Sequence, residues 1–254
     1  MSEEDTLYSV LQGVATITLN REGAKNALSV GLMNSLGDNL QRAESDDSVR
    51  AIVLTNTGNT FCAGADLKGD MTVKPRYGLP EIFGLMQGCS KPVVGRIAGH
   101  CMGGGVGLAA ACDISIAADD VKLGFTEVRI GVAPAIISVV CLPKMRYGDA
   151  MELFLSGERI SADRAASVGL VNTAVPRASL TNAVQGLLGK VVQGGPNALA
   201  AAKSLVVKVP DMSKEDAFAW TGMLSASLFQ SEEASAGIAA FRANEQPEIL
   251  MVFE

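Results

Sequence analysis

The sequence predicts a mixed α/β domain built on a mostly parallel, covered sheet and followed by a helical segment. Short apolar runs at Ala51–Leu54, Val93–Ile97 and Ile114–Ala117 alternate with helical patterns through short connections. Strands that are buried on both faces have such continuous apolar runs, and intervening helices make their connections parallel. From Pro196 onward we find only helical periodicity. The helices predicted there cover 197–208, 214–229 and 232–243.

The chain begins with a predicted β-hairpin. Residues Tyr8–Leu11 and Val14–Leu19 alternate apolar with polar side chains on either side of Gln12-Gly13, which is typical of two paired strands. Ser29 then stands where a helix N-cap is expected, before a stretch over 30–43 with apolar side chains on one face.

The remaining elements follow from the same periodicities. Residues 71–80 contain two prolines and a glycine, so we expect them to be irregular. Further strands are predicted at 122–125 and 170–175. Further helices are predicted at 81–89, from the glycine run to about 111, and at 149–155, 162–168 and 180–192. A boundary near residue 190 would divide the chain into a core over 1–190 and a helical segment over 191–254.

The composition excludes several classes of function. The 254-residue chain carries a net charge of -6, which argues against a general nucleic-acid partner. The most apolar window, Val132–Leu142, is short and contains Pro134, so we expect no membrane span. One histidine and no clustered cysteines argue against a zinc site, and we expect no metal.

The cysteines and the N-terminus indicate the compartment. The five cysteines, Cys62, Cys89, Cys101, Cys112 and Cys141, include no C-x-x-C pair, and the chain is too long for a disulfide scaffold. The acidic, polar N-terminus does not resemble a signal or transit peptide. We therefore expect reduced thiols and a cytoplasmic location.

A glycine-rich run over Gly99–Asp113 is the first candidate for chemistry. Gly103, Gly104, Gly105 and Gly107 lead directly into a run of small apolar residues. If that run is a helix, its first N–H groups have no partner within the helix and carry the positive end of the helix dipole. This arrangement suits an anion, or an oxygen that becomes anionic during a reaction.

A second loop, Thr60–Lys68, also follows a buried strand. If the strands before the two loops are parallel neighbours, both loops lie at the same edge of the sheet, where open α/β folds bind ligands. Each loop could then direct a free backbone N–H at one oxygen. The alternative is that both are ordinary tight turns, and glycine and alanine alone do not decide between these interpretations.

Glu127 is the candidate proton-transfer group. It stands among apolar residues at the end of a predicted strand. A desolvated carboxyl has a raised pKa and can exchange protons near neutrality. The alternative is a surface glutamate that is paired with Arg129 or Lys122. The histidine, His100, has no nucleophile motif to serve and is interpreted as structural.

Taken together, these segments resemble the crotonase family, the enoyl-CoA hydratase/isomerase superfamily. The resemblance covers nearly the whole chain, and the order and spacing of its motifs make it specific. The motifs are Leu19–Arg21, Lys25–Ser29, Phe61–Lys68, Gly99–Asp113, Phe125–Pro134, Gly157–Ile160 and Ala162–Val171.

The resemblance implies a fold and an assembly. The implied fold is a crotonase (ClpP-like) spiral of ββα units, with acyl-CoA binding and catalysis in the core over 1–190. The C-terminal helical domain over 191–254 would form trimers, which usually pair into hexamers. The expected partners are therefore an acyl-CoA substrate and further copies of the chain. No separate cofactor is implied, because coenzyme A is part of the substrate thioester.

The resemblance also implies roles for individual residues. The N–H groups of Ala65 and Gly104 would hold the thioester oxygen, and Glu127 would be the general acid/base. Ala63 would offer its carbonyl to the adenine, and the lysines would lie near phosphate. The residues expected to contact the substrate are Lys25, Ala27, Leu28, Ala63, Asp66, Leu67, Lys68, Met102, Gly107 and Pro134.

One position departs from the family pattern. Hydratases of the family typically use two glutamates, and this chain has Gly107 where the first would stand. An isomerase that moves a double bond needs only one carboxylate. Some single-acid hydratases of branched or bulky enoyl-CoAs resemble the stretch over 127–138, which favours hydratase. Isomerase, or an acyl-CoA-binding paralog with little activity, remains the alternative.

The acyl group itself is left open. Residues 70–90 and 128–142 are expected to line the acyl pocket. Their apolar side chains, Met71, Tyr77, Leu79, Ile82, Phe83, Ile136 and Ile137, favour an apolar acyl chain. Arg129 could instead bind a carboxylate.

Overall fold

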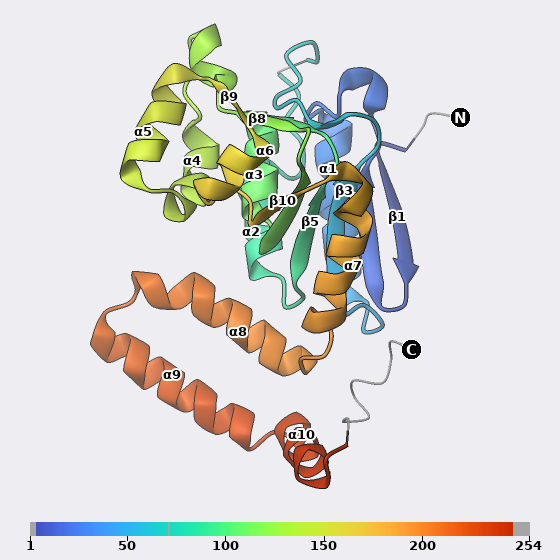
Figure 1. Ribbon diagram of the computed structural model, residues 1–254, viewed down its shortest axis with the longest axis vertical. Helices are drawn as coiled ribbons and strands as arrows, with labels where there is room; N and C mark the ends of the chain where they lie inside the picture. Colours follow the sequence, from blue (N-terminus) through green and yellow to red (C-terminus); the bar gives the residue numbers. More distant parts are fainter. Residues whose placement is uncertain (1–3, 71, 246–254) are drawn as a thin grey trace.

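The structure is a computed structural model that describes residues 4–70 and 72–245. Its central feature is a six-stranded sheet with the order β1-β2-β3-β5-β7-β10 (Figure 1). β1 and β2 pair antiparallel, and every other neighbouring pair is parallel. The strands are β1 (Thr6–Leu11), β2 (Val14–Leu19), β3 (Ala51–Asn56), β5 (Val93–Ile97), β7 (Ile114–Ala118) and β10 (Thr173–Val175). The predicted hairpin and parallel sheet are both confirmed.

Helices cover both faces of this sheet. Figure 1 shows α7 in front of the strands, with α1 and α3 behind them, and every residue of β3 is buried. Ser29 caps α1 as predicted, since its side chain accepts a hydrogen bond of 3.2 Å from Leu32 N. The helices are α1 (Val30–Ser45), α2 (Leu79–Gly88), α3 (Gly104–Ala111) and α7 (Leu180–Val191).

A second, four-stranded sheet holds the loops of interest, and sequence patterns indicated only one of its strands. Its order is β4-β6-β8-β9. β4 pairs parallel with β6, and β6 pairs parallel with β8. Each strand has three residues, which is too short for a period-2 pattern to be visible. The strands are β4 (Thr60–Cys62), β6 (His100–Met102), β8 (Lys122–Gly124) and β9 (Arg159–Ser161).

Three stretches differ from the sequence-based expectation. The strand predicted at 170–175 covers only Thr173–Val175, because Leu170 N bonds back to Ala165 O (2.9 Å) in a turn after Gly169, whose φ is +89°. Helix α2 begins at Leu79, so the irregular stretch ends earlier than expected. A helix at 135–141 was not predicted. The helices of this part are α4 (Ala135–Cys141), α5 (Tyr147–Ser156) and α6 (Ala162–Ser167).

The three predicted C-terminal helices are present, and they extend away from the sheet (Figure 1). They are α8 (Pro196–Lys208), α9 (Lys214–Phe229) and α10 (Glu232–Ala243). No residue of α9 or α10 is buried. Within the described ranges, no helix is long and apolar enough to cross a membrane. The domain boundary near 190 stays a prediction, since α7 continues to Val191.

Candidate active site

Two loops of the second sheet meet at the carboxyl ends of its parallel strands. β4 and β6 pair with Cys62 opposite Cys101, so the residues that follow them leave the sheet at the same edge. Gly64 takes φ +89°, and a Cβ atom there would lie 3.0 Å from Met102 O and 3.4 Å from Gly104 N. The backbones of the two loops are therefore in contact, as the family resemblance implied.

Leu28 fixes the first loop in place. Its N–H donates to Gly64 O at 2.8 Å, and Leu28 forms a parallel bridge with Ala65. Leu28 Cδ1 would lie 2.6 Å from a Cβ on Gly104, so glycine there lets this side chain approach the start of α3. Leu28 thus contacts both loops.

Two backbone N–H groups at this edge have no acceptor. Gly104 is the first residue of α3, so its N–H has no partner within the helix. Within the part of the chain that the structure describes, neither Gly104 N nor Ala65 N donates a hydrogen bond. The dipole of α3 adds positive potential at the same place. Both donors are therefore available to an oxygen.

Glu127 lies beside these loops with an unsatisfied carboxylate. It is in a 3₁₀ turn at Thr126–Ile130, and a Cβ on Gly103 would lie 3.0 Å from its Oε1. Its Oε2 is buried without a hydrogen-bond partner among the described residues. Burial raises the pKa of Glu127, although its own backbone N–H opposes the shift. Buried polar groups without partners are rare in folded proteins and call for an explanation.

The alternative interpretation of Glu127 as a paired surface acid is wrong. Among the ion pairs of the described residues, none joins Glu127 to Arg129 or Lys122. Arg129 lies instead against the end of α5, where its Nε would be 3.3 Å from a Cβ on Gly157. His100 is structural as expected, since its Nδ1 accepts the Lys122 N–H at 3.0 Å.

The position of the absent second acid is filled by apolar side chains. A Cβ on Gly107 would lie 2.5 Å from Ile137 Cγ2 and 2.9 Å from Phe83 Cζ. Ile137 on α4 and Phe83 on α2 are 3% and 4% exposed. Neither side chain can turn out into solvent to make room for a side chain at position 107. The Gly107 N–H donates to Gly103 O at 3.3 Å, so the apolar pair at Gly107 lies one turn along the chain from the glycine that the Glu127 carboxylate approaches.

Asp113 does not replace the absent acid. Its Oδ2 lies 2.8 Å from Lys203 Nζ and accepts the Val93 N–H at 2.7 Å. Asp113 therefore forms its contacts beyond the C-terminal end of α3, whereas Glu127 lies near the N-terminal end of that helix.

The residues expected along the coenzyme A path lie on neighbouring loops. Lys25 is exposed, and its carbonyl accepts the Ala63 N–H at 3.1 Å. Ala27 is 9% exposed. Leu67 and Lys68 are exposed next to Asp66. The structure brings this group together at the edge of the second sheet.

Asp66 shapes its loop, which the motif did not reveal. Its carboxylate accepts the N–H groups of Lys68 and Gly69, both at 3.2 Å, and pairs with Arg21 at 3.3 Å. These contacts keep the pKa of Asp66 below its ordinary value against the opposing effect of desolvation. Arg21 was not a predicted site residue, yet it also donates to Ala27 O at 3.0 Å.

Asn26 is a second residue that sequence reasoning missed. It is fully buried at φ +50°, and its amide donates to Thr57 O and Thr60 O. An asparagine beside a glycine-containing turn was the available signal, because asparagine tolerates this backbone conformation.

Met102 and Pro134 have positioning roles in the backbone. Met102 ends β6 by pairing with Gly124, and its carbonyl lies against Gly64. Pro134 is the N-cap residue of α4, the helix that carries Ile137 to Gly107.

Comparison with known proteins identifies the family. A family profile described as enoyl-CoA hydratase/isomerase matches residues 10–249. The chain belongs to this family. The 2,3-dehydroadipyl-CoA hydratase of Escherichia coli (strain K12) is 30% identical over 250 residues, which are 96% of this chain and 98% of that protein. The short-chain-enoyl-CoA hydratase of Clostridium acetobutylicum is also 30% identical, over 90% of each chain.

Solved structures of the enoyl-CoA hydratase/isomerase family share this fold. An enoyl-CoA hydratase from Mycobacterium smegmatis superposes with a TM-score of 0.90 at 30% identity, covering 97% of this chain and 99% of that one. An enoyl-CoA hydratase from Mycobacterium tuberculosis gives a TM-score of 0.88 at 30% identity, with 97% and 98% covered. The crotonase fold predicted from the sequence motifs is thus confirmed.

Proposed function

We propose that this protein is an enoyl-CoA hydratase with Glu127 as its general acid/base. The observation that supports this most is the buried, unpartnered Oε2 of Glu127 beside a loop contact that leaves the N–H groups of Ala65 and Gly104 free. A proton-transfer group next to two convergent donors is the combination that enolate chemistry needs.

The proposed chemistry needs only the two N–H donors and the one carboxyl. The thioester oxygen accepts hydrogen bonds from Ala65 N and Gly104 N. Glu127 takes a proton from water as the oxygen of that water bonds to C3, and the enolate charge collects on the thioester oxygen. The same carboxyl then returns a proton to C2. Fixed donors stabilise the enolate more than the carbonyl, and losing one typically costs about 10²- to 10³-fold in rate.

The coenzyme A part of the substrate would follow the loop edge. We propose that Ala63 O meets the adenine and that Lys25 and Lys68 approach phosphate, with Ala27, Leu28, Asp66 and Leu67 along the path. Both lysines are exposed, which leaves their ammonium groups accessible to an anion. Met102, Gly107 and Pro134 complete the proposed contacts on the acyl side.

Hydration is proposed over double-bond migration because the relatives named above are hydratases. A single carboxylate could also carry out isomerisation, and binding without turnover is a further outcome. The deciding experiment supplies 2-enoyl- and 3-enoyl-CoAs of short, branched and bulky chains in H₂¹⁸O and separates the products. A 3-hydroxyacyl-CoA carrying ¹⁸O supports the proposal. A migrated double bond without ¹⁸O, or bound substrate without product, contradicts it.

A matched pair of variants assigns the carboxylate. Glu127→Gln is expected to lower kcat by about 10²- to 10⁴-fold, the usual contribution of a positioned acid/base. Glu158→Gln changes a nearby exposed glutamate and is expected to retain wild-type activity. Full activity in Glu127→Gln would refute the assignment.

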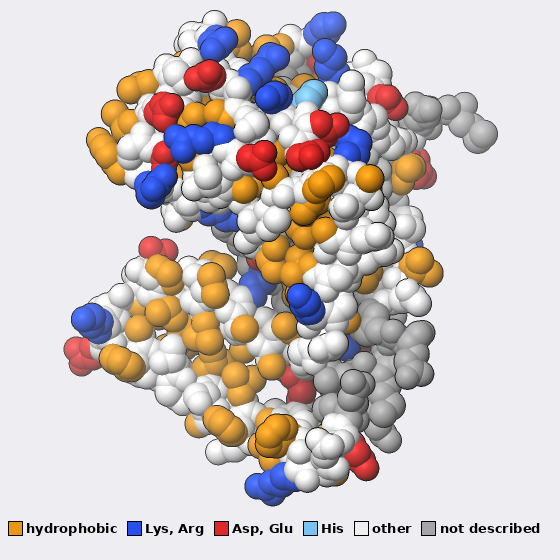
Figure 2. Space-filling view, viewed as in Figure 1, with side chains coloured by type: hydrophobic (Ala, Val, Ile, Leu, Met, Phe, Trp, Pro, Cys, Tyr) orange, Lys and Arg blue, Asp and Glu red, His pale blue; other side chains and the backbone are white. Residues whose placement is uncertain are grey.

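We also propose that the chain forms trimers or hexamers through its C-terminal helices. Figure 2 shows hydrophobic side chains gathered over α8 and α9. Several large side chains of these two helices are exposed, namely Val206, Phe218, Met223 and Phe229, and so is Phe241 on α10. Such apolar area on one segment usually marks an interface. Light scattering on the purified protein should give a molar mass three or six times that of the 26.3 kDa chain. The mass of a monomer would contradict this proposal.

A cytoplasmic location is proposed on the state of the thiols. All five cysteines are free and buried, which suits a reducing compartment. Fractionation of the source cells with an antibody against the protein would test it.

A further inference from the structure

Lysine side chains occupy the C-terminal ends of three helices whose N-terminal ends lie toward the proposed site. Lys91 Nζ donates to Ala43 O at 2.6 Å near the end of α1. Lys144 Nζ donates to Cys112 O at 3.1 Å after α3. Lys203 Nζ donates to Met86 O at 2.7 Å near the end of α2. Each lysine satisfies a carbonyl that the helix leaves without a partner and carries the charge that this end of the dipole favours.

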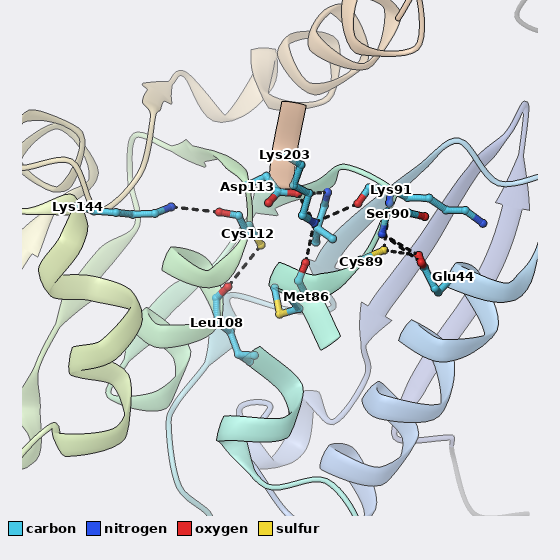
Figure 3. A network of polar contacts seen from close by, with 11 residues as sticks. Glu44, Met86, Cys89, Ser90, Lys91, Leu108, Cys112, Asp113, Lys144 and Lys203 are labelled. Atoms are coloured by element: carbon cyan, nitrogen blue, oxygen red, sulfur yellow. Dashed lines mark hydrogen bonds and ion pairs between the residues drawn. The ribbon is translucent and has the colours of Figure 1, made fainter. Parts of the chain in front are cut away.

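Lys203 differs from the other two because it comes from the C-terminal helical segment. Figure 3 shows its side chain among Met86, Lys91 and Asp113. Its ammonium group is 2.8 Å from Asp113 Oδ2 and also donates to Lys91 O at 3.2 Å. The Lys203 side chain is only 8% exposed. A buried ammonium group requires such complete pairing, since desolvation otherwise makes it costly.

The partners of Lys203 belong to two elements of the site. Met86 is on α2, whose first residue, Leu79, lies 3.5 Å from where a Cβ on Gly104 would be. Asp113 follows α3, which begins with Gly104, and the Asp113 carboxylate also bonds to Val93 N on β5. Lys203 therefore ties the far end of α2 to the far end of α3 and to the central sheet.

We propose that Lys203 is a positioning residue that sets how α2 lies against α3 at Gly104 and Gly107. The position of α2 in turn determines the shape of the acyl pocket. The proposal rests on the proposed function, because it assigns the α2–α3 contact to acyl recognition. A displacement of α2 moves Leu79 and Phe83 relative to Gly104 and Gly107. We expect Glu127 to stay in place, because its carboxylate lies against Gly103, which precedes α3. Lys203 thus acts on acyl selectivity and not on proton transfer.

The test must separate this positioning from simple stabilisation. Lys203→Met alone leaves the half-buried Asp113 carboxylate without the ammonium group that contacts it, so a loss of stability is expected whatever the role of Lys203. The double variant Lys203→Met/Asp113→Asn removes both charges, and the side-chain amide carbonyl introduced at position 113 can still accept the Val93 N–H. We expect its Tm to recover most of the loss, while Met86 O still lacks its anchor. Lys190→Met, which changes an exposed lysine on α7, is the matched control.

Two measurements on the double variant decide the proposal. The ratio of kcat/KM between a four-carbon and an eight-carbon 2-enoyl-CoA should change by about threefold or more, since small misplacements of binding groups alter rates steeply. Amide hydrogen exchange over 79–88 should be faster than in the wild type. An unchanged ratio with unchanged exchange would overturn the proposal, and so would an unchanged ratio with faster exchange, which would leave only a stabilising role.

Failure of the proposed function is recognised separately. If the wild type binds enoyl-CoAs without turnover, the hydratase proposal fails, and the selectivity is then measured as the ratio of the two dissociation constants. A double variant with the wild-type ratio of dissociation constants would refute the positioning role. A changed ratio with faster exchange over α2 would support it.

Discussion

The Glu127 carboxylate lies against the backbone of Gly103, where a Cβ atom would be 3.0 Å from its Oε1. Gly103 also takes φ +51° immediately before α3. The two residues thus share one small space between the 3₁₀ turn and the glycine-rich helix. The position of the carboxylate depends on a residue without a side chain.

The first prediction concerns Gly103→Ala. Alanine at φ +51° and ψ -120° is strained, and strained backbone positions cost about 1–3 kcal/mol. Its Cβ would also displace the Glu127 carboxylate. We expect a loss of stability in that range, measured by urea unfolding, together with a fall in kcat. Wild-type kcat at reduced stability would show that Glu127 does not need this position.

The second prediction is the pH dependence of stability at Glu127. The pKa of Glu127 is raised by burial in the folded state, so the folded protein binds the proton more tightly than the unfolded chain. The stabilisation is fully present below the unfolded pKa and is lost as pH rises through the folded pKa. Glu127→Gln removes the buried charge, so its Tm should exceed that of the wild type at pH 8 and approach it at pH 4.

A Tm difference that is independent of pH would contradict this explanation. Glu158→Gln, which changes an exposed glutamate, is the control. The same raised pKa predicts that hydration slows as pH falls through it, because the base must be ionised to accept a proton.

The third prediction concerns the packing over Gly107. Alanine at 107 would place its Cβ 2.5 Å from Ile137 Cγ2, and overpacking a core typically costs about 1–3 kcal/mol. In an Ile137→Ala background the Cγ2 contact is absent, although Phe83 Cζ would still lie 2.9 Å from the new Cβ, so Gly107→Ala should cost less stability than in the wild type. A double-mutant cycle by urea unfolding measures the coupling. Additive effects would mean that the two residues do not compete for space.

The same packing predicts that a second acid cannot simply be introduced. Gly107→Glu would bring a charge into the space held by Ile137 and Phe83, and a buried unpaired charge costs several kcal/mol. We expect lower yield of folded protein and no gain in hydration rate. A stable Gly107→Glu variant with higher kcat would contradict the packing described above.

The fourth prediction concerns the thiols. Burial raises the pKa of Cys62, Cys89, Cys112 and Cys141 to about 12, and burial also raises that of Cys101. The thiolate is the reactive form, so the native protein at pH 8 should react with Ellman's reagent only as fast as it unfolds. In guanidinium chloride, all five thiols should react. Rapid labelling of any native cysteine would identify a locally open region.

Structural features that depend only on residues close together in the chain could be predicted from the sequence. The hairpin around Gln12-Gly13, the Ser29 cap and the start of α3 at Gly104 all follow from local chemistry. The motifs over 61–68 and 99–113 also predicted that two loops meet, and Gly64 is in contact with Gly104.

Features that depend on distant segments were not predictable in this way. The strands β4 and β6 have three residues each, and they exist because Thr60 pairs with His100, which is far along the chain. Phe83 and Ile137 were expected to line the acyl pocket, but their packing on Gly107 depends on how α2 and α4 approach α3. The contact made by Asp113 was not predictable either, since its partner Lys203 lies on a helix whose docking no local pattern reveals.

Both free donors at the candidate site, Ala65 N and Gly104 N, belong to the main chain. Substitutions other than proline can therefore displace these groups but cannot delete them. An amide-to-ester replacement introduced by chemical ligation would remove one N–H and leave every side chain unchanged. Substitutions other than proline that preserve the backbone path leave both donors present, so change at these two positions need not alter the chemistry. Sequence divergence in such a site is expected to act first through the residues that surround the donors.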